Sequence, residues 1–176
     1  YCVFEDQPQR QYVCHATSTD LTNWTKYPDE TFGPDESIYL LTDWRDPHVI
    51  WNEEEKCWWM ILCAQNQGNT KRRGCVGLCK SADLIIGHAV NLYMHRSQAC
   101  LLTSARIFFY MNGWWYLVFS QFTDRFQTLY RMSRSCNGPW IRPKTDSFDG
   151  RAFYAAKTCS DGEHRYIFGW NPTRTQ

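Results

Sequence analysis

The chain has 176 residues, a formal net charge of +1 and an aromatic content of 16%, including nine tryptophans. A net charge this close to zero is not typical of proteins that bind polyanions. The one basic run, Lys71-Arg72-Arg73, is followed by Gly74, as in a loop. We therefore predict no nucleic-acid partner. No apolar run approaches the roughly 18 residues of a membrane span, so we predict no membrane partner. The aromatic content favours β structure and surfaces that stack on flat ligands.

The nine cysteines are scattered along the chain. Cys75 and Cys79 form the only close pair with polar neighbours, and the gap between them is not a usual zinc spacing. No metal spacing is formed by the histidines either, which are His15, His48, His88, His95 and His164. We therefore predict no metal and no cofactor. An odd cysteine count without a paired framework indicates reduced thiols, which favours a cytoplasmic over a secreted setting, although the compartment is not otherwise predicted.

Three segments have the pattern of β-hairpins, in which two aromatic or β-branched runs flank a polar turn. They span residues 48–64, 106–120 and 152–170. Asn112-Gly113 and Asp161-Gly162 are strong turn dipeptides at the centres of the second and third segments. Helical periodicity is almost absent, so the sequence predicts an all-β fold.

A second sequence pattern recurs between the hairpins. It reads ATSTDLTNW at 16–24, KSADLIIG at 80–87 and RMSRSCNGPW at 131–140, which gives a unit of about 50 residues. A four-stranded unit of this length, repeated, is typical of a β-propeller blade. The alternative is an irregular β-sandwich with chance similarity. Three hairpins and a partial N-terminal strand predict roughly three blades, whereas propellers have about four to eight, so we expect an incomplete ring with bare sheet edges.

Three stretches together resemble one known family. They are Trp44-Arg45-Asp46-Pro47 before a hairpin, NGWWYLVFS at 112–120, and GRAFYAAKT at 150–158 followed by RYIFGW at 165–170. Their order and spacing resemble the catalytic propeller of glycoside hydrolase family 32, the β-fructosidases (invertases, levanases and inulinases). The likeness extends from about residue 17 to residue 170.

The resemblance implies a five-bladed β-propeller, a fold shared with families 43 and 68. Residues 1–176 would then form a single partial catalytic domain that lacks the N-terminal blade and any C-terminal domain. It also implies a retaining glycosidase, in which an Asp attacks the anomeric carbon and a Glu acts as acid and base. The substrate would be a fructose-containing saccharide such as sucrose, inulin or levan.

Matched to the family's motifs, Asp46 is the stabiliser of the transition state, and Arg45 is its substrate-contacting or orienting neighbour. The alternative for Asp46 is a turn carboxylate that caps backbone N–H groups before Pro47. The aromatic side chains that would face the sugar are Trp44, Tyr154 and Trp170, for which core packing is the alternative. Asp149 would also face the funnel, although Asp149-Gly150 equally fits a turn.

Two catalytic carboxylates of the family have no counterpart in the sequence. No stretch resembles the Asn-Asp-Pro-Asn-Gly strand that holds the nucleophile. Ser104-Ala105-Arg106 stands where Glu-Cys-Pro would, and no Asp or Glu lies between Asp83 and Asp124. We hypothesise a shift of reading frame near His95-Arg96-Ser97, and we expect the chain alone not to hydrolyse fructosides.

Two further functions remain open. A propeller that keeps Asp46 and the aromatic residues could bind carbohydrate without cleaving it. An arabinosidase or xylosidase of the family 43 type is the other alternative, although the joint presence of Arg-Asp-Pro and the Phe-Tyr-Ala-x-Lys-Thr segment favours family 32.

Overall fold

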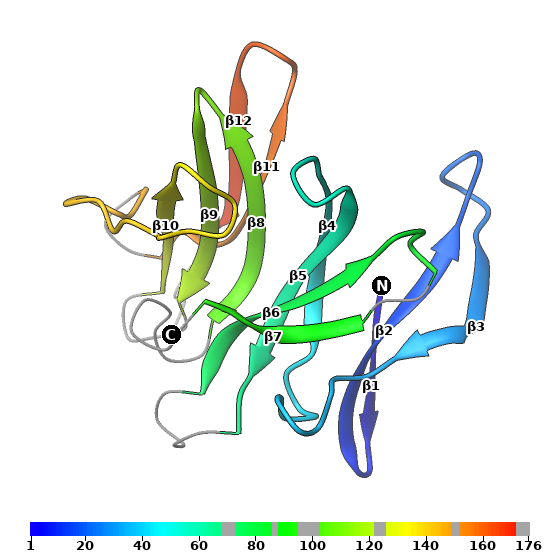
Figure 1. The fold of residues 1–176 in the computed structure, drawn as a ribbon. Coiled ribbons are helices and arrows are strands. Elements are labelled where there is room, and N and C mark those ends of the chain that lie inside the picture. Colours follow the sequence, from blue (N-terminus) through cyan, green and yellow to red (C-terminus); the bar gives the residue numbers. More distant parts are fainter. Residues whose placement is uncertain (68–72, 86–87, 95–102, 122–125, 149–151, 172–176) are drawn as a thin grey trace.

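The protein is all-β. The computed structural model describes residues 1–67, 73–85, 88–94, 103–121, 126–148 and 152–171, and among them there is no helix. The described residues form twelve strands in four antiparallel sheets (Figure 1). At four strands per propeller blade, this is the strand content of three blades distributed over four sheets.

The sheets follow one another along the chain. The first contains β1 (Cys2–Asp6), β2 (Gln9–Thr17) and β3 (Thr25–Phe32). The second contains β4 (Arg45–Asn52), β5 (Cys57–Gln65), β6 (Gly74–Ser81) and β7 (His88–Met94). The third contains β8 (Thr103–Met111), β9 (Trp114–Gln121) and β10 (Gln127–Ser133). The fourth contains β11 (Tyr154–Ser160) and β12 (Arg165–Trp170).

The three predicted hairpins are confirmed as β4–β5, β8–β9 and β11–β12. Asn112 and Gly113 have φ angles of 51° and 79°, as a tight hairpin turn requires at both central positions. Strand β8 begins three residues before the predicted segment, because its backbone pairing starts at Thr103 opposite Gln121. The prediction of one partial strand at the N-terminus was wrong, since a three-stranded sheet lies there; β1 is exposed along its whole length and so lacks an apolar pattern.

The recurring sequence pattern forms the same turn at the ends of β2 and β6. After β2, the Ser18 hydroxyl accepts hydrogen bonds from the backbone N–H groups of Asp20 and Leu21. After β6, the Ser81 hydroxyl accepts the corresponding bonds from Asp83 and Leu84. Both leucines have left-handed backbones, with φ angles of 61° and 68°. The two Ser-x-Asp-Leu copies of the repeat therefore form the same turn, whereas the third copy, at 131–140, has no such tetrapeptide.

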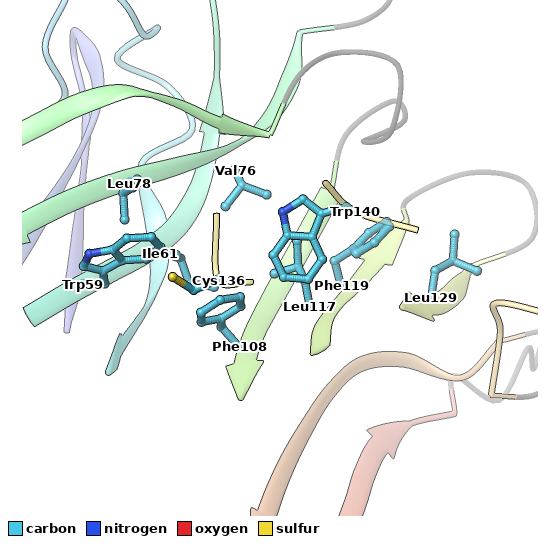
Figure 2. Close-up of a cluster of buried hydrophobic side chains, with 10 residues drawn as sticks. All are labelled: Trp59, Ile61, Val76, Leu78, Phe108, Leu117, Phe119, Leu129, Cys136 and Trp140. Atoms are coloured by element: carbon cyan, nitrogen blue, oxygen red, sulfur yellow. The ribbon is translucent and has the colours of Figure 1, made fainter. Parts of the chain in front are cut away.

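Strand β5 is buried on both faces, which explains its unbroken run of apolar residues. Its side chains at Trp59 and Ile61 enter a core shared with β8 and β9 (Figure 2). The alternate side chains, Leu62 and Ala64, enter a second core with Tyr39 and other residues. Each large side chain removed from water contributes about 1.5–3 kcal/mol. These two cores hold the second sheet against its neighbours on either side.

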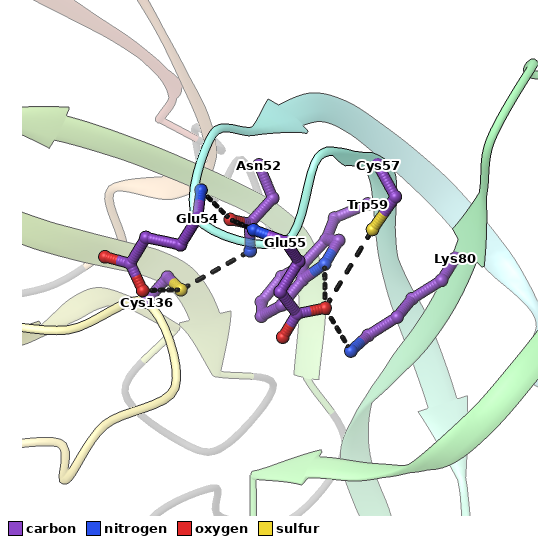
Figure 3. A network of polar contacts seen from close by, with 7 residues as sticks. All are labelled: Asn52, Glu54, Glu55, Cys57, Trp59, Lys80 and Cys136. Carbon is purple, nitrogen blue, oxygen red and sulfur yellow. Dashed lines mark hydrogen bonds and ion pairs between the residues drawn. The ribbon is translucent and has the colours of Figure 1, made fainter.

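A polar network ties the β4–β5 turn to the segment after β10 (Figure 3). The Asn52 side chain accepts hydrogen bonds from the backbone of Glu54 and Glu55 and donates one to Cys136 Sγ at 3.4 Å. The Cys136 thiol contacts the Glu54 carboxylate at 3.6 Å, and burial raises the pKa of this thiol. The network therefore joins the second and third sheets at the turn ends of their strands.

Candidate functional site

The first strands of the last three sheets lie next to one another. Strand β4 contacts β8, and β8 contacts β11 (Figure 1). A cavity of about 350 Å³ is lined by the later residues of all three strands, among them Ile50 and Trp51 of β4, Phe108 of β8 and Thr158 of β11. The early parts of these strands therefore lie together at the other end.

Each of these three strands breaks its pairing register close to its start. The shifts fall between Arg45 and His48, between Ser104 and Arg106, and between Tyr154 and Lys157. Such β-bulges redirect side chains out of the regular ladder and are common beside active sites. The three bulges thus lie on neighbouring strands, at the end where β4, β8 and β11 begin. The Arg-Asp-Pro motif lies at the bulge of β4.

Asp46 lies within β4, at the bulge, rather than in a turn. Its φ angle is 56°, which is rare and costly for a residue with a side chain, and its side chain is half-buried. The Cys63 thiol on β5 donates a hydrogen bond to Asp46 Oδ2 at 3.4 Å. Cys2 of β1 also interacts with Asp46: partial desolvation raises the pKa of the Cys2 thiol, a hydrogen bond from the Asp46 backbone lowers it, and the charge of Asp46 raises it by a smaller amount.

Arg45 is held by one polar side chain from the first sheet and one from the preceding loop. Its Nη1 atom donates to the Asp43 carboxylate and to Gln11 Oε1, the latter at 3.3 Å. The other Asp43 oxygen accepts a hydrogen bond from Gln65 Nε2 at the end of β5. Burial alone would lower the pKa of Arg45, but the hydrogen bond and charge of Asp43, with smaller effects of Cys63 and Asp46, raise it overall.

Trp44 belongs to the core, which corrects the expectation that it faces a sugar. Its exposed fraction is 0%, and its ring packs against Tyr39 at a centroid distance of 5.1 Å. On the other side the ring covers Gly77, where an added Cβ would lie 3.2 Å from Trp44 Cζ3. Trp44 therefore anchors the strand start from which Arg45 and Asp46 project.

The other predicted site residues have different surroundings. Tyr154 is buried at the start of β11, with its ring edge-on to Phe126 at 5.2 Å and to Trp170 at 6.5 Å. Trp170 is 59% exposed, so its ring is open to solvent. Asp149 lies outside the described residues, as does the His95-Arg96-Ser97 segment.

Sequence reasoning missed Gln11, Asp43, Gln65 and Cys63. Asp43 stands two residues before Arg45, so proximity to the motif was an available signal. Cys63 pairs with Arg45 across the β4–β5 hairpin, and Gln65 follows on the same face, so the hairpin register could have identified both. Gln11 comes from another sheet, and nothing local in the sequence connects it to Arg45.

The described residues contain no cluster of His, Cys, Asp or Glu that could hold a metal ion. In the same part of the chain, no helix is long and apolar enough to cross a membrane. A second cavity of about 290 Å³ lies against the first two sheets and is lined mainly by apolar side chains; Asp46 lines neither cavity.

Several solved structures share this fold. A family 32 β-fructofuranosidase from Bombyx mori matches 93% of this chain with a TM-score of 0.69 and 22% identity. An inulosucrase from Halalkalicoccus jeotgali, bound to kestose, matches 93% with a TM-score of 0.66 and 14% identity. A levansucrase from Bacillus subtilis matches 89% with a TM-score of 0.61 and 12% identity.

The chain spans 36% of the length of the Bombyx mori enzyme, 50% of the inulosucrase and 53% of the levansucrase. A search of curated protein sequences gives no match. The model of the N-terminal domain of glycosyl hydrolases family 32 matches residues 3–175. The family expected from the three sequence stretches is thereby confirmed, and the chain belongs to glycosyl hydrolases family 32.

Proposed function

We propose that this chain is part of an enzyme that hydrolyses β-fructosidic bonds in sucrose or fructans. The observation that carries the proposal is the position of Asp46, at a strained bulge next to Arg45 on the first strand of its sheet. Family membership and the likeness to a β-fructofuranosidase and to an inulosucrase bound to kestose support it.

In this mechanism Asp46 is not the attacking group. Its carboxylate accepts hydrogen bonds from fructosyl hydroxyls and stabilises the positive charge that develops on the ring in the oxocarbenium-like transition state. The guanidinium of Arg45 donates hydrogen bonds to the same sugar. Trp170 offers an aromatic face to the C–H side of the ring, and Asp149 is a further candidate for contact with a hydroxyl.

The cleavage step needs two more carboxyl groups, about 5–5.5 Å apart in a retaining enzyme. The sequence contains no Asn-Asp-Pro stretch and no Asp or Glu between Asp83 and Asp124. We therefore expect residues 1–176 alone, as part of a five-bladed propeller, to lack hydrolytic activity. The same observation favours a second candidate, a propeller that binds a fructose-containing saccharide without cleaving it.

The test is to express the protein from its complete open reading frame, alongside residues 1–176 alone. Release of fructose from sucrose, inulin and levan is measured, together with cleavage of an aryl arabinofuranoside. Fructose release by the complete protein, with none by residues 1–176, is the expected result. Saccharide binding without hydrolysis would establish the second candidate, and cleavage of the arabinoside alone would overturn the fructosidase assignment.

A further inference from the structure

Arg45 belongs to a group of polar side chains that are joined by hydrogen bonds. Gln11 of β2, Asp43 of the preceding loop and Gln65 of β5 form a polar group that we call the Arg45 cradle. Its members come from two sheets and a loop. The side chains of Arg45 and Asp43 are 32% and 16% exposed, so solvent screens their interaction only partly.

The contacts of the cradle leave one edge of the guanidinium free. Nη1 donates to Asp43 and to Gln11. Among the residues that the structure describes, Nη2 and Nε of Arg45 have no hydrogen-bond partner. These N–H groups form a planar fork whose direction is fixed once Nη1 is held, and such a fork suits neighbouring hydroxyl oxygens of a sugar.

Both carboxylate oxygens of Asp43 accept hydrogen bonds. One of its oxygens accepts from Arg45, and the other accepts from Gln65 and, at 3.5 Å, from Thr42 Oγ1. Its carboxylate thus links Arg45 to Gln65. Gln65 in turn fixes the orientation of this carboxylate.

Gln11 connects the cradle to the first sheet. Its side-chain oxygen accepts from the Trp44 backbone N–H at 2.9 Å as well as from Arg45. Its own backbone N–H donates to the Leu41 carbonyl at 3.0 Å. The loop that carries Asp43 is thus fastened on both sides of that residue, and Trp44 behind it is locked in the core.

We propose that Gln11, Asp43 and Gln65 are positioning residues that hold the Arg45 guanidinium by Nη1 and so aim its Nη2 and Nε groups at hydroxyls of the bound saccharide. The inference rests on the proposed function, because it takes Arg45 as a saccharide contact. It adds a set of residues that determine how tightly and in which orientation the sugar is held.

The test is a double-mutant cycle on the protein expressed from the complete open reading frame, with sucrose as the probe. Asp43→Asn removes the charge with little change of shape, and we expect KM to rise about tenfold with kcat changed less than about threefold, because binding geometry is lost rather than chemistry. Arg45→Ala should raise KM at least as much. In the Arg45→Ala background, Asp43→Asn should then have no further effect, since Asp43 acts through Arg45.

One control and one second test variant separate positioning from folding. Glu53→Gln removes a carboxylate from the exposed Lys56 ion pair in the β4–β5 turn and should leave KM unchanged. Gln65→Met keeps side-chain length but removes the donor to Asp43, so it should reproduce part of the Asp43→Asn effect even if that variant folds poorly. Thermal unfolding of each variant identifies loss of fold.

The outcomes also distinguish this inference from the proposed function. If the parent protein neither cleaves nor binds sucrose, inulin or levan, the proposed function fails, and the inference fails with it. If the parent is active and Arg45→Ala impairs it, but the effects of Asp43→Asn and Arg45→Ala multiply, the proposed function stands and the positioning role is overturned. An unchanged KM in both Asp43→Asn and Gln65→Met would overturn it as well.

Discussion

Asp46 combines backbone strain with a half-buried charge, and neither feature benefits folding. A left-handed backbone at a non-glycine residue costs on the order of 1–2 kcal/mol, which the surrounding strand pairing must offset. The bulge is what turns the side chain at this position out of the ladder. A residue kept at such a position is consistent with a role in binding or chemistry.

Cys63 is predicted to orient the Asp46 carboxylate, because its buried thiol donates to Oδ2 at 3.4 Å. Cys63→Val removes the donor, and a lost hydrogen bond of about 1 kcal/mol corresponds to roughly a fivefold fall in kcat/KM for sucrose. Cys63→Ser keeps a donor and should retain the activity within about twofold. Steady-state kinetics on the complete protein decide this, and equal losses in both variants would contradict an orienting role.

At the residue scale, the Arg-Asp-Pro motif was predictable from the sequence, but the side chains that hold Arg45 were not. Arg45 and Asp46 were recognised by their neighbours in the chain. Trp44 was misassigned, because an aromatic residue next to a site looks the same in sequence whether it faces a ligand or the core. The Arg45 cradle was invisible, since Gln11 approaches through tertiary structure alone.

Among the elements, the Ser-x-Asp-Leu turn depends on an ionised carboxylate. Asp20 accepts hydrogen bonds from the backbone N–H groups of Thr22 and Asn23 and from side chains, and these lower its pKa below the ordinary value of 3.8. A depressed folded-state pKa means that the stability it contributes is present above the unfolded value, about 3.9, and is lost as the pH falls further.

Asp20→Asn should therefore reduce the free energy of unfolding at pH 7, and the difference from the parent should shrink as the pH falls below about 4. Urea unfolding of the protein expressed from the complete open reading frame, at a series of pH values, measures this. Asp29→Asn, an exposed substitution on β3, is the matched control. A difference that stays constant from pH 7 to pH 3 would show that the ionised form is not what the turn requires.

The segment after β10 is fastened by a buried ion pair. Arg131 Nη1 donates to Asp146 Oδ2 at 2.6 Å, and the two side chains are 6% and 10% exposed. Asp146→Ala leaves a buried guanidinium without this carboxylate and should lower the free energy of unfolding by about 3–5 kcal/mol. Arg142→Ala removes the exposed partner of the same carboxylate and should cost at most about 1 kcal/mol. Denaturant unfolding compares them, and similar losses would contradict the buried pair as the anchor.

The elements themselves were largely predictable, because alternating aromatic runs and turn dipeptides are local signals. The three hairpins and the repeated turn agree with the sequence pattern. The first sheet was missed because β1, exposed along its length, has no buried face to leave a pattern.

At the scale of the molecule, the fourth sheet has only two strands (Figure 1), and it presents apolar side chains to solvent. Phe168 and Trp170 on β12 are 61% and 59% exposed. Residues 1–176 alone should therefore self-associate and elute from size-exclusion chromatography ahead of a monomer. Phe168→Lys should reduce the association, since lysine on an edge strand disfavours pairing with a second copy. A sharp monomer peak for the parent chain would contradict this.

The sequence repeat predicted sheets that lie next to one another, but not how many sheets a closed ring would contain. A repeat of about 50 residues indicates stacked four-stranded units. The sheets do lie next to one another, but among the described residues only the second has four strands, and the others have three, three and two. The number of blades in a closed ring is a property of the whole circle, and it cannot be counted from units that contact only their neighbours. The five-bladed ring therefore stays a proposal.

The most direct test of the account is the turnover of sucrose by the complete protein carrying Asp46→Asn. The substitution keeps the shape of the side chain and removes the charge that would stabilise the oxocarbenium-like transition state. We predict that kcat falls about 10²–10³-fold while the thermal unfolding temperature stays close to that of the parent. Asp29→Asn should leave kcat unchanged. An Asp46→Asn protein that turns over sucrose at nearly the parent rate would contradict the account at its centre.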